Sequence, residues 1–300
     1  MAITTFDGII SARTDGNFWD WLYDGNTTQQ TPIAGAWYNL TARIAQVNRT
    51  VLTYGTYVNA GNNGAIMNAA TGGAIPIPYS GAGAQRFLTA FGAMVSSISG
   101  FTALMLIDTL WAGGPITVAS SATVQATSTS PTLTRYTGSV AAYTGNMLML
   151  DVGTLFGGTQ GTFSVNYTKE DNSTTHATTT FTPTTAAGTA NRVLQAGVTY
   201  GAPFIPLVSG DLGVSHVNSI TFGSGSSPTG TIYLNIVRPL MIIPTLGANT
   251  WVERDITTTM DSLIELVRGS DSQHGCLQVL GLGNGTSAAN AFYSLRTVSG

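Results

Sequence analysis

The feature that most constrains the fold is a predicted hairpin between Gly161 and Thr182. In its first half, large apolar residues alternate with polar ones, which is typical of a strand with one buried face. An Asp-Asn-Ser turn follows at 171–173, and a second alternating segment ends at Phe181. The pattern predicts two antiparallel strands. The positions expected on the apolar face are Phe163, Val165, Tyr167, Ala177, Thr179 and Phe181.

The same alternation predicts the register of this hairpin. A turn with an odd number of residues would place Phe163 opposite Phe181 and Tyr167 opposite Ala177. An even number would divide the apolar positions between the two faces, because a slip of one residue inverts every side chain. We therefore expect the odd turn, with His176 on the polar face.

Strand patterns also dominate the rest of the chain. In the second half they recur at intervals of roughly 8 to 15 residues, separated by Gly, Pro and Asn, which favours an antiparallel sandwich over βαβ units. We therefore expect a mainly β protein: an antiparallel, jelly-roll-like β-sandwich with long Gly/Thr-rich loops and one or two short helices. Helical spacing of apolar residues predicts such helices near Thr4–Gly16, at Arg86–Ser97 and at Met260–Val267.

Changes in composition divide the chain into three expected regions. Residues 1–60 would form an N-terminal helix and an aromatic arm for docking, 61–130 a β and loop region, and 131–300 the β-sandwich domain. The low-complexity segment Ala119–Pro131 is the best candidate for a boundary, because its Ala, Ser and Thr residues suit an exposed connection.

The chain is unusually poor in charge. Only 8% of its residues are Asp, Glu, Lys or Arg, against about 25% in an ordinary soluble domain. A weakly charged surface lacks the repulsion that keeps proteins apart, so we expect much of it to be covered by other subunits. A monomer with a Thr-rich β surface is the alternative. The net charge of −3, with no basic cluster, argues against nucleic acid as a partner.

Targeting features are not evident. Met1–Ile10 has neither a basic region nor an apolar core, so no secretory signal is expected. The longest apolar run, Phe101–Trp111, contains Asp108 and is shorter than the ~20 residues that span a bilayer. We expect synthesis in the cytoplasm and no membrane partner. The single cysteine, Cys276, cannot form an internal disulfide and is expected to be buried.

An aromatic segment near the N-terminus is the candidate docking site. Residues 18–23 read Phe-Trp-Asp-Trp-Leu-Tyr between two copies of Asp-Gly-Asn, at 15–17 and 24–26. Because Trp and Tyr dominate binding hot spots, a loop presenting them suits an interface. That the segment folds back on its own domain is the alternative. The expected interface residues are Phe6, Ile9, Ile10, Phe18, Trp19, Trp21 and Tyr23.

Motifs for catalysis are missing from the sequence. It contains no G-x-S-x-G, Walker loop, H-E-x-x-H or paired cysteines, and its histidines (His176, His216 and His274) are isolated. We therefore expect no enzyme activity and no catalytic, cofactor-binding or metal-binding residues. Two alternatives remain open. Oxygen ligands from Asp15, Asn17, Asp20 and Asp24 could hold Ca²⁺, or two of Asp151, Glu170, Asp171 and Asp211 could form a glycosidase pair.

Five short segments resemble one family. They are Ile3–Ile10, Leu133–Thr137, Ile236–Leu240, Trp251–Asp255 and Gly275–Leu277, and they look like tailed-bacteriophage virion structural proteins of the capsid decoration (cement) type. The resemblance implies a β-rich homotrimer on the outer capsid surface of the virion that bridges neighbouring copies of the major capsid protein. It implies no catalytic residues. A second hypothesis is a tail-associated adhesin that recognises host-surface carbohydrate through Trp19, Trp21 and Trp111.

Overall fold

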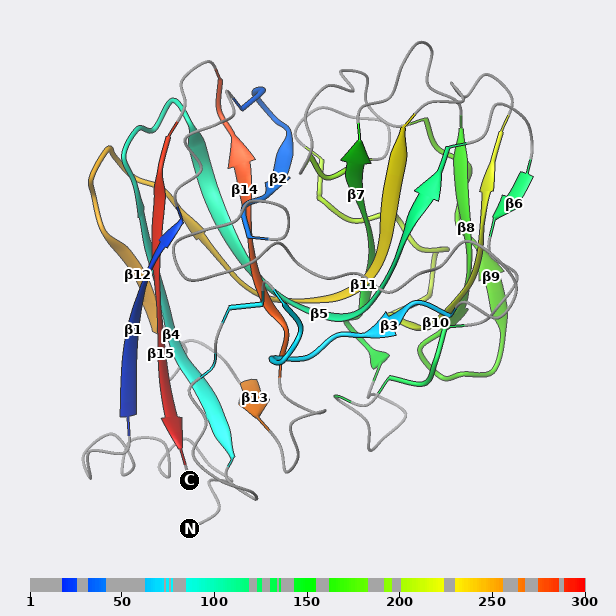
Figure 1. Ribbon diagram of the computed structural model, residues 1–300, viewed down its shortest axis with the longest axis horizontal. Coiled ribbons are helices and arrows are strands. Elements are labelled where there is room, and N and C mark those ends of the chain that lie inside the picture. The colour runs from blue at the N-terminus through cyan, green and yellow to red at the C-terminus, as the bar shows by residue number, and fades with distance from the viewer. Residues whose placement is uncertain are drawn as a thin grey trace.

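The protein is an assembly of antiparallel strands (Figure 1). The computed structural model describes residues 18–25, 32–41, 63–72, 74–75, 77, 85–118, 123–125, 130–133, 135, 143–154, 162–182, 192–195, 201–223, 230–255, 264–267, 275–285 and 289–299. These residues contain strands and no α-helix, so the predicted mainly β, antiparallel class is confirmed. The strands are β1 (Phe18–Gly25), β2 (Trp37–Asn39), β3 (Ala65–Ile66), β4 (Arg86–Val95), β5 (Phe101–Thr117), β6 (Thr123–Gln125), β7 (Met147–Thr154), β8 (Phe163–Lys169), β9 (Thr175–Ala177), β10 (Val214–Phe222), β11 (Thr231–Pro244), β12 (Val252–Asp255), β13 (Ile264–Val267), β14 (Leu277–Gly283) and β15 (Ala291–Ser299).

The strands form three sheets. The β4 sheet has the order β1-β15-β4-β12, with β13 also paired to β4. The central sheet has the order β2-β14-β5-β11-β7, with β3 paired to β5, and the β8 sheet has the order β6-β10-β8-β9. In Figure 1 the β4 sheet lies on the left and the β8 sheet on the right, with the central sheet between them.

Two long strands connect the halves of the molecule. β5 has 17 residues and β11 has 14, and Figure 1 shows both curving from one half into the other. Their pairing contains three register shifts, and such irregularities bend a sheet. As a result, the first part of β5 buries Leu104 and Leu106 against the β4 sheet, whereas its later part buries Leu110 and Ile116 against the β8 sheet.

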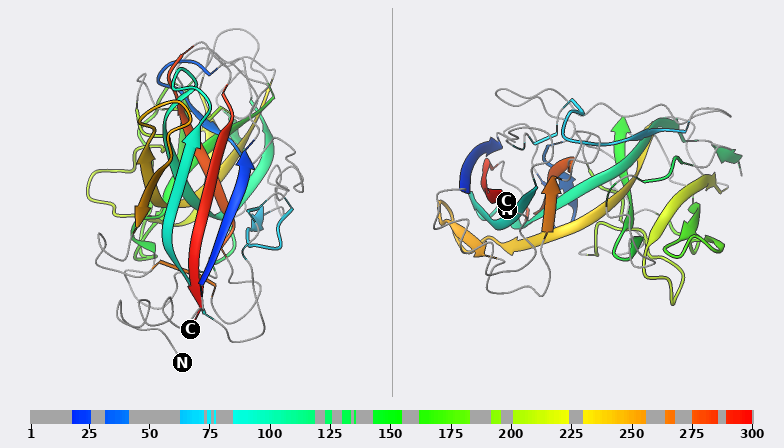
Figure 2. Two further views of the ribbon diagram at one scale, coloured as in Figure 1. Left: turned by 90° about the vertical axis from the view of Figure 1, so that its left-hand side faces the viewer. Right: turned by 90° about the horizontal axis from the view of Figure 1, so that it is seen from below.

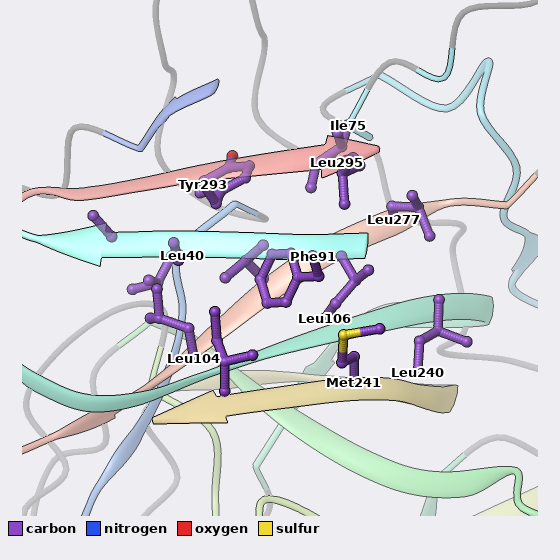
Figure 3. Packing of buried hydrophobic residues seen from close by; sticks show 14 of the residues in the cluster. Leu40, Ile75, Phe91, Leu104, Leu106, Leu240, Met241, Leu277, Tyr293 and Leu295 are labelled. Atoms are coloured by element: carbon purple, nitrogen blue, oxygen red, sulfur yellow. The ribbon is translucent and has the colours of Figure 1, made fainter. Parts of the chain in front are cut away.

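Each half therefore has its own hydrophobic core. The first core lies between the β4 sheet and the central sheet (Figure 3), and the second lies between the β8 sheet and the central sheet. The first core includes Leu88, Phe91, Leu104, Leu106, Tyr293 and Leu295. The second core includes Leu110, Trp111, Leu150, Phe163, Tyr167 and Phe222.

The central sheet closes into a ring. Residues 192–194 lie between its two edge strands: Val193 N–H donates to Trp37 O of β2 at 2.9 Å, and Leu194 N–H donates to Leu150 O of β7 at 2.8 Å. The residues of a third cluster alternate with those that face the two main cores, so they point into the ring. They are Trp37, Met105, Ile107, Met149, Val193, Val237 and Leu280.

Polar side chains share the ring interior with this cluster. Asn39 Nδ2 donates to Asp151 Oδ2 at 3.2 Å and to Gln278 Oε1 at 2.7 Å, and Asn235 Nδ2 donates to the same Asp151 oxygen at 3.3 Å. These four residues come from β2, β7, β11 and β14, so their hydrogen bonds cross the ring. A buried carboxylate is tolerated because amide N–H groups solvate it.

A buried ion pair lies where the two cores diverge. Arg135 Nη2 is 2.7 Å from Asp108 Oδ1, and both side chains are almost completely buried. The guanidinium also donates to the carbonyls of Met67 and Thr109, while Cys276 N–H donates to Asp108 at 2.8 Å. This explains the acidic residue within the longest apolar run of the sequence. The buried carboxylate of Asp108 in β5 is neutralised by Arg135 and accepts a further hydrogen bond from Cys276 N–H.

Two of the predicted helices are wrong, because the described residues there form strands. Arg86–Val95 is the strand β4, and nearly all of its side chains are buried, so apolar residues occur on both faces and imitate helical spacing. Ile264–Val267 is the strand β13, which pairs with β4. The rest of the segment predicted to be a helix at 260–267, and the one expected at 4–16, lie outside the described residues.

The predicted hairpin is present, with one change of register. Phe163 pairs with Phe181 as predicted, but Tyr167 pairs with His176 rather than with Ala177. Lys169 N–H bonds Thr174 O, so the turn has four residues, and one extra residue between Thr178 and Phe181 restores the outer pair. The return strand is therefore inverted near the turn: Ala177 and Thr179 are exposed.

The expected regions do not correspond to separate sheets. β4 and β5 come from residues 61–130, but they pair with β15, β14 and β11 from residues 131–300. β6, inside the expected boundary segment, pairs with β10 in the β8 sheet. The halves of the molecule are interleaved in sequence because their strands are shared.

Candidate functional site: an apolar groove between strands β11 and β12

A shallow groove lies where the end of β11 passes β12. It has a volume of about 220 Å³, and five of its six lining residues are apolar. Most of the lining comes from β11, in which a register shift lies between Pro239 and Met241. Leu240 and Met241 are buried and form the floor of the groove, whereas Ile242 is exposed. The lining residues are Met105, Pro239, Leu240, Met241, Ile242 and Arg254.

Apolar side chains continue from the groove onto the surface. Ile242 is 43% exposed although it lies within β11, and Leu246, just beyond the strand, is 71% exposed. Scattered apolar residues are normal on a surface, but a contiguous apolar patch is typical of an interaction site. The apolar lining, with the exposed Ile242, forms such a patch, which we call the β11 groove.

One positive charge borders the β11 groove. Arg254 is exposed, and within the described part of the chain it has no ion-pair or hydrogen-bond partner. Its neighbour in the same sheet, Arg296, is different, because its guanidinium is 2.8 Å from the carboxylate of Glu253. The groove therefore offers an apolar wall and an unpaired guanidinium, which suits an apolar surface that carries an acidic group.

The predicted aromatic arm lies elsewhere. Its segment Phe18–Gly25 is the strand β1, which pairs along its whole length with β15 at the edge of the β4 sheet. Trp21 is the register partner of Leu295, and Tyr23 that of Tyr293. The segment is thus part of its own domain and not a detached arm, which was the alternative reading. Of the expected interface residues, Phe18, Trp19, Trp21 and Tyr23 are in β1, whereas Phe6, Ile9 and Ile10 lie outside the described residues.

Trp111 cannot act as a sugar platform, so this part of the adhesin hypothesis is wrong. Its side chain is completely buried in the second core, and its indole N–H donates to Asn63 O at 2.8 Å. A different tryptophan, Trp251, is 40% exposed. Sequence reasoning missed it, although a turn-rich segment (Gly-Ala-Asn-Thr at 247–250) directly before it was a usable signal of exposure.

The candidate carboxylates have separate roles. Asp151 is inside the ring, and Glu170 accepts hydrogen bonds from the backbone N–H groups of Leu212 and Gly213 at 3.1 and 3.2 Å. Asp171 pairs with Lys169 at the exposed turn. For the suggested Ca²⁺ ligands, Asp20 and Asp24 are in β1, while Asp15 and Asn17 lie outside the described residues.

Asp211 anchors the 205–213 segment to the hairpin. Its carboxylate accepts a hydrogen bond from Tyr167 and lies 2.7 Å from His176 Nδ1. His176 therefore lies on the face of Tyr167, not on the polar face expected from the odd turn. Burial would raise the pKa of Asp211, but these hydrogen bonds outweigh it and hold the pKa below its usual value. Burial, together with the bond to Asp211, raises the pKa of Tyr167.

The other histidines are uninformative about chemistry. His216 is nearly buried in β10, and desolvation lowers its pKa. His274 lies outside the described residues. Among the residues that are described, no three His, Cys, Asp or Glu side chains gather closely enough to hold a metal ion.

Comparisons with known proteins give no relatives. No family model, curated protein or solved structure matches this chain. Within the described ranges there is also no helix long and apolar enough to cross a membrane.

Proposed function

We propose that this protein is a structural component of a bacteriophage virion, which decorates and stabilises the outer capsid surface by bridging neighbouring subunits. Its partners would be the major capsid protein and further copies of itself, as a homotrimer. The β11 groove is the observation that carries this proposal, because it gives a charge-poor protein one defined apolar surface with which to dock.

The position of the groove agrees with the resemblance described above. Two of the five resembling segments, Ile236–Leu240 and Trp251–Asp255, border it and supply Pro239, Leu240 and Arg254 to its lining. The resemblance and the geometry therefore support the same docking surface.

A substitution that introduces a charge into the β11 groove tests the proposal. Ile242→Asp would place a carboxylate in the apolar interface, so the variant should lose binding to heads of the encoding phage that lack this protein, measured by co-sedimentation. Ile98→Asp is the matched control, because Ile98 is 46% exposed and Ile242 43%. The control should bind like the unchanged protein. Equal binding by both variants would exclude the groove as the docking surface.

Copy number separates the head role from the tail role. A decoration protein should be present in purified virions in a fixed ratio to the major capsid protein, whereas a tail-associated adhesin should be present in far fewer copies. Quantitative mass spectrometry of intact virions measures this ratio. A low ratio would move the assignment to the tail even if the Ile242→Asp variant behaves as expected.

A further inference from the structure

Trp251 is held against the surface of the β4 sheet. Its indole packs over Gly92 of β4, so closely that a β-carbon on Gly92 would lie 2.7 Å from Cζ2 and 2.9 Å from Cε2. Only glycine leaves room for this contact. The indole therefore packs directly on the backbone of β4 while 40% of the residue remains exposed.

This tryptophan belongs to a different face from the β11 groove. Side chains of a strand alternate between faces, so Trp251 and Glu253 lie on the outer face of the β4 sheet, whereas Arg254 borders the groove. Figure 2, left, looks toward this sheet and shows β12, β4, β15 and β1 side by side. Two separate surfaces therefore meet at β12.

The outer face around Trp251 carries apolar and polar side chains: Met94, two residues from Gly92, and its register partner Phe292 share this face. Glu253 and Ser294 are the register partners of Gly92 on its two sides, and Ser294 Oγ lies 3.0 Å from where a β-carbon on Gly92 would be. Arg296 pairs with Glu253 across the sheet at 2.8 Å. The side chain of Ser294 is buried, so the groups available beside the exposed indole are a carboxylate and a guanidinium. The indole N–H makes no hydrogen bond within the described part of the chain.

This combination of groups favours one class of ligand. The core of a protein interface is depleted of charged residues, but here the Glu253–Arg296 ion pair lies directly beside the indole. An aromatic ring beside oriented polar side chains fits a ligand with one apolar face and many hydroxyls. We propose that Trp251 and its neighbours form a saccharide-binding site, in which the C–H face of a neutral hexose unit stacks on the indole and its hydroxyls bond Glu253 and Arg296.

The test uses the full chain and a panel of immobilised neutral oligosaccharides built from glucose, galactose, mannose and N-acetylglucosamine. The unchanged protein should bind at least one of them, and Trp251→Ala should weaken that binding by about tenfold or more, because the stacking surface is removed. Trp251→Phe should retain part of the affinity. Glu253→Gln should also weaken binding, since it replaces a charged acceptor by an amide.

Two controls separate this site from the docking surface. Leu246→Ala removes an even more exposed apolar side chain, and Ile242→Asp disrupts the β11 groove, yet both should bind the same sugars as the unchanged protein. Unfolding midpoints of all variants, measured in the same buffer, exclude loss of structure. The proposal is overturned if the unchanged protein binds no sugar of the panel. It is also overturned if the Trp251→Ala variant binds a sugar with the same affinity as the unchanged protein.

Discussion

The two cores of this protein share two strands but differ at their margins. The first core is bordered by the short strands β12 and β13, and around it Ile98, Ile242, Leu246 and Trp251 remain exposed. The second core is closed by the β8 hairpin, where Phe181 stacks on Phe163 with ring centroids 6.0 Å apart and Phe163 meets Phe222 edge to face at 5.1 Å.

This difference indicates a division of labour. Both outer sheets end in short strands, β12 and β13 with four residues each and β6 and β9 with three each, so strand length does not explain the difference. Among the described residues, Leu212 is 62% exposed in the second half, but more of the exposed large apolar side chains lie around the first core. Both proposed binding surfaces lie beside the first core. The half around the second core would then mainly provide stability, which is transmitted through β5 and β11.

The largest expected effect comes from the junction between the cores. Arg135→Met leaves the buried carboxylate of Asp108 without its counter-ion and removes donors from two buried carbonyls. We expect the free energy of unfolding to fall by about 3–5 kcal/mol, measured by urea denaturation. Arg296→Met is the control, because its ion pair is at the surface and should change stability by less than about 1 kcal/mol. Similar losses in both variants would contradict a special role for the junction.

A matched pair of substitutions on one strand asks whether the cores are independent. Leu106→Ala removes a buried side chain from the first core, and Leu110→Ala does the same in the second core, both from β5. Each should lower the free energy of unfolding by about 2–5 kcal/mol. Because β5 crosses both cores, hydrogen exchange should show one cooperative loss of protection in β15 and β10 together. Separate transitions would mean that the halves unfold as independent units.

Low pH should lower the stability of the half around the second core by protonating Asp211. The pKa of this carboxyl is lower in the folded protein than in an unfolded chain, so its contribution is present above about pH 4 and is lost as the pH falls through the folded pKa. Asp211→Asn should therefore cost about 1.5–3 kcal/mol at neutral pH and less in acid. Thermal unfolding from pH 7 to pH 2 checks this. An unchanged acid dependence in the variant would show that another group is responsible.

The smallest expected effect concerns Cys276 at the junction. Burial raises the pKa of its thiol to about 12, so almost no thiolate is present near neutral pH, and the side chain is inaccessible. A thiol-specific reagent at pH 8 should not label the native protein and should label it fully in denaturant. Mass spectrometry measures the extent. Rapid labelling of the native protein would reveal local opening between the cores.

The sequence predicted the strand content and the Phe163–Phe181 pair, because alternation of apolar and polar residues is a local property. It did not predict the extra residue between Thr178 and Phe181, since a bulge adds length without changing composition. It also failed at β4, where burial on both faces removes the alternation by which a strand is recognised.

The candidate sites were missed for a related reason. Ile242 belongs to the run Leu-Met-Ile-Ile at 240–243, which reads as buried throughout, and nothing local shows that the surface beside it is left open. The predicted docking residues Trp19, Trp21 and Tyr23 form an aromatic segment of the kind found at interfaces, yet their backbone is an edge strand of the β4 sheet.

By itself, the sequence determined that the chain would form antiparallel strands, keep its one thiol from forming an internal disulfide and present few charges, because periodicity and composition are carried by each segment alone. Only the tertiary structure decided that the central sheet closes into a ring, that two cores share β5 and β11, and that Ile242 and Trp251 stay exposed. These features depend on which strands become neighbours, and neighbours distant in sequence are selected by the packing of the whole chain.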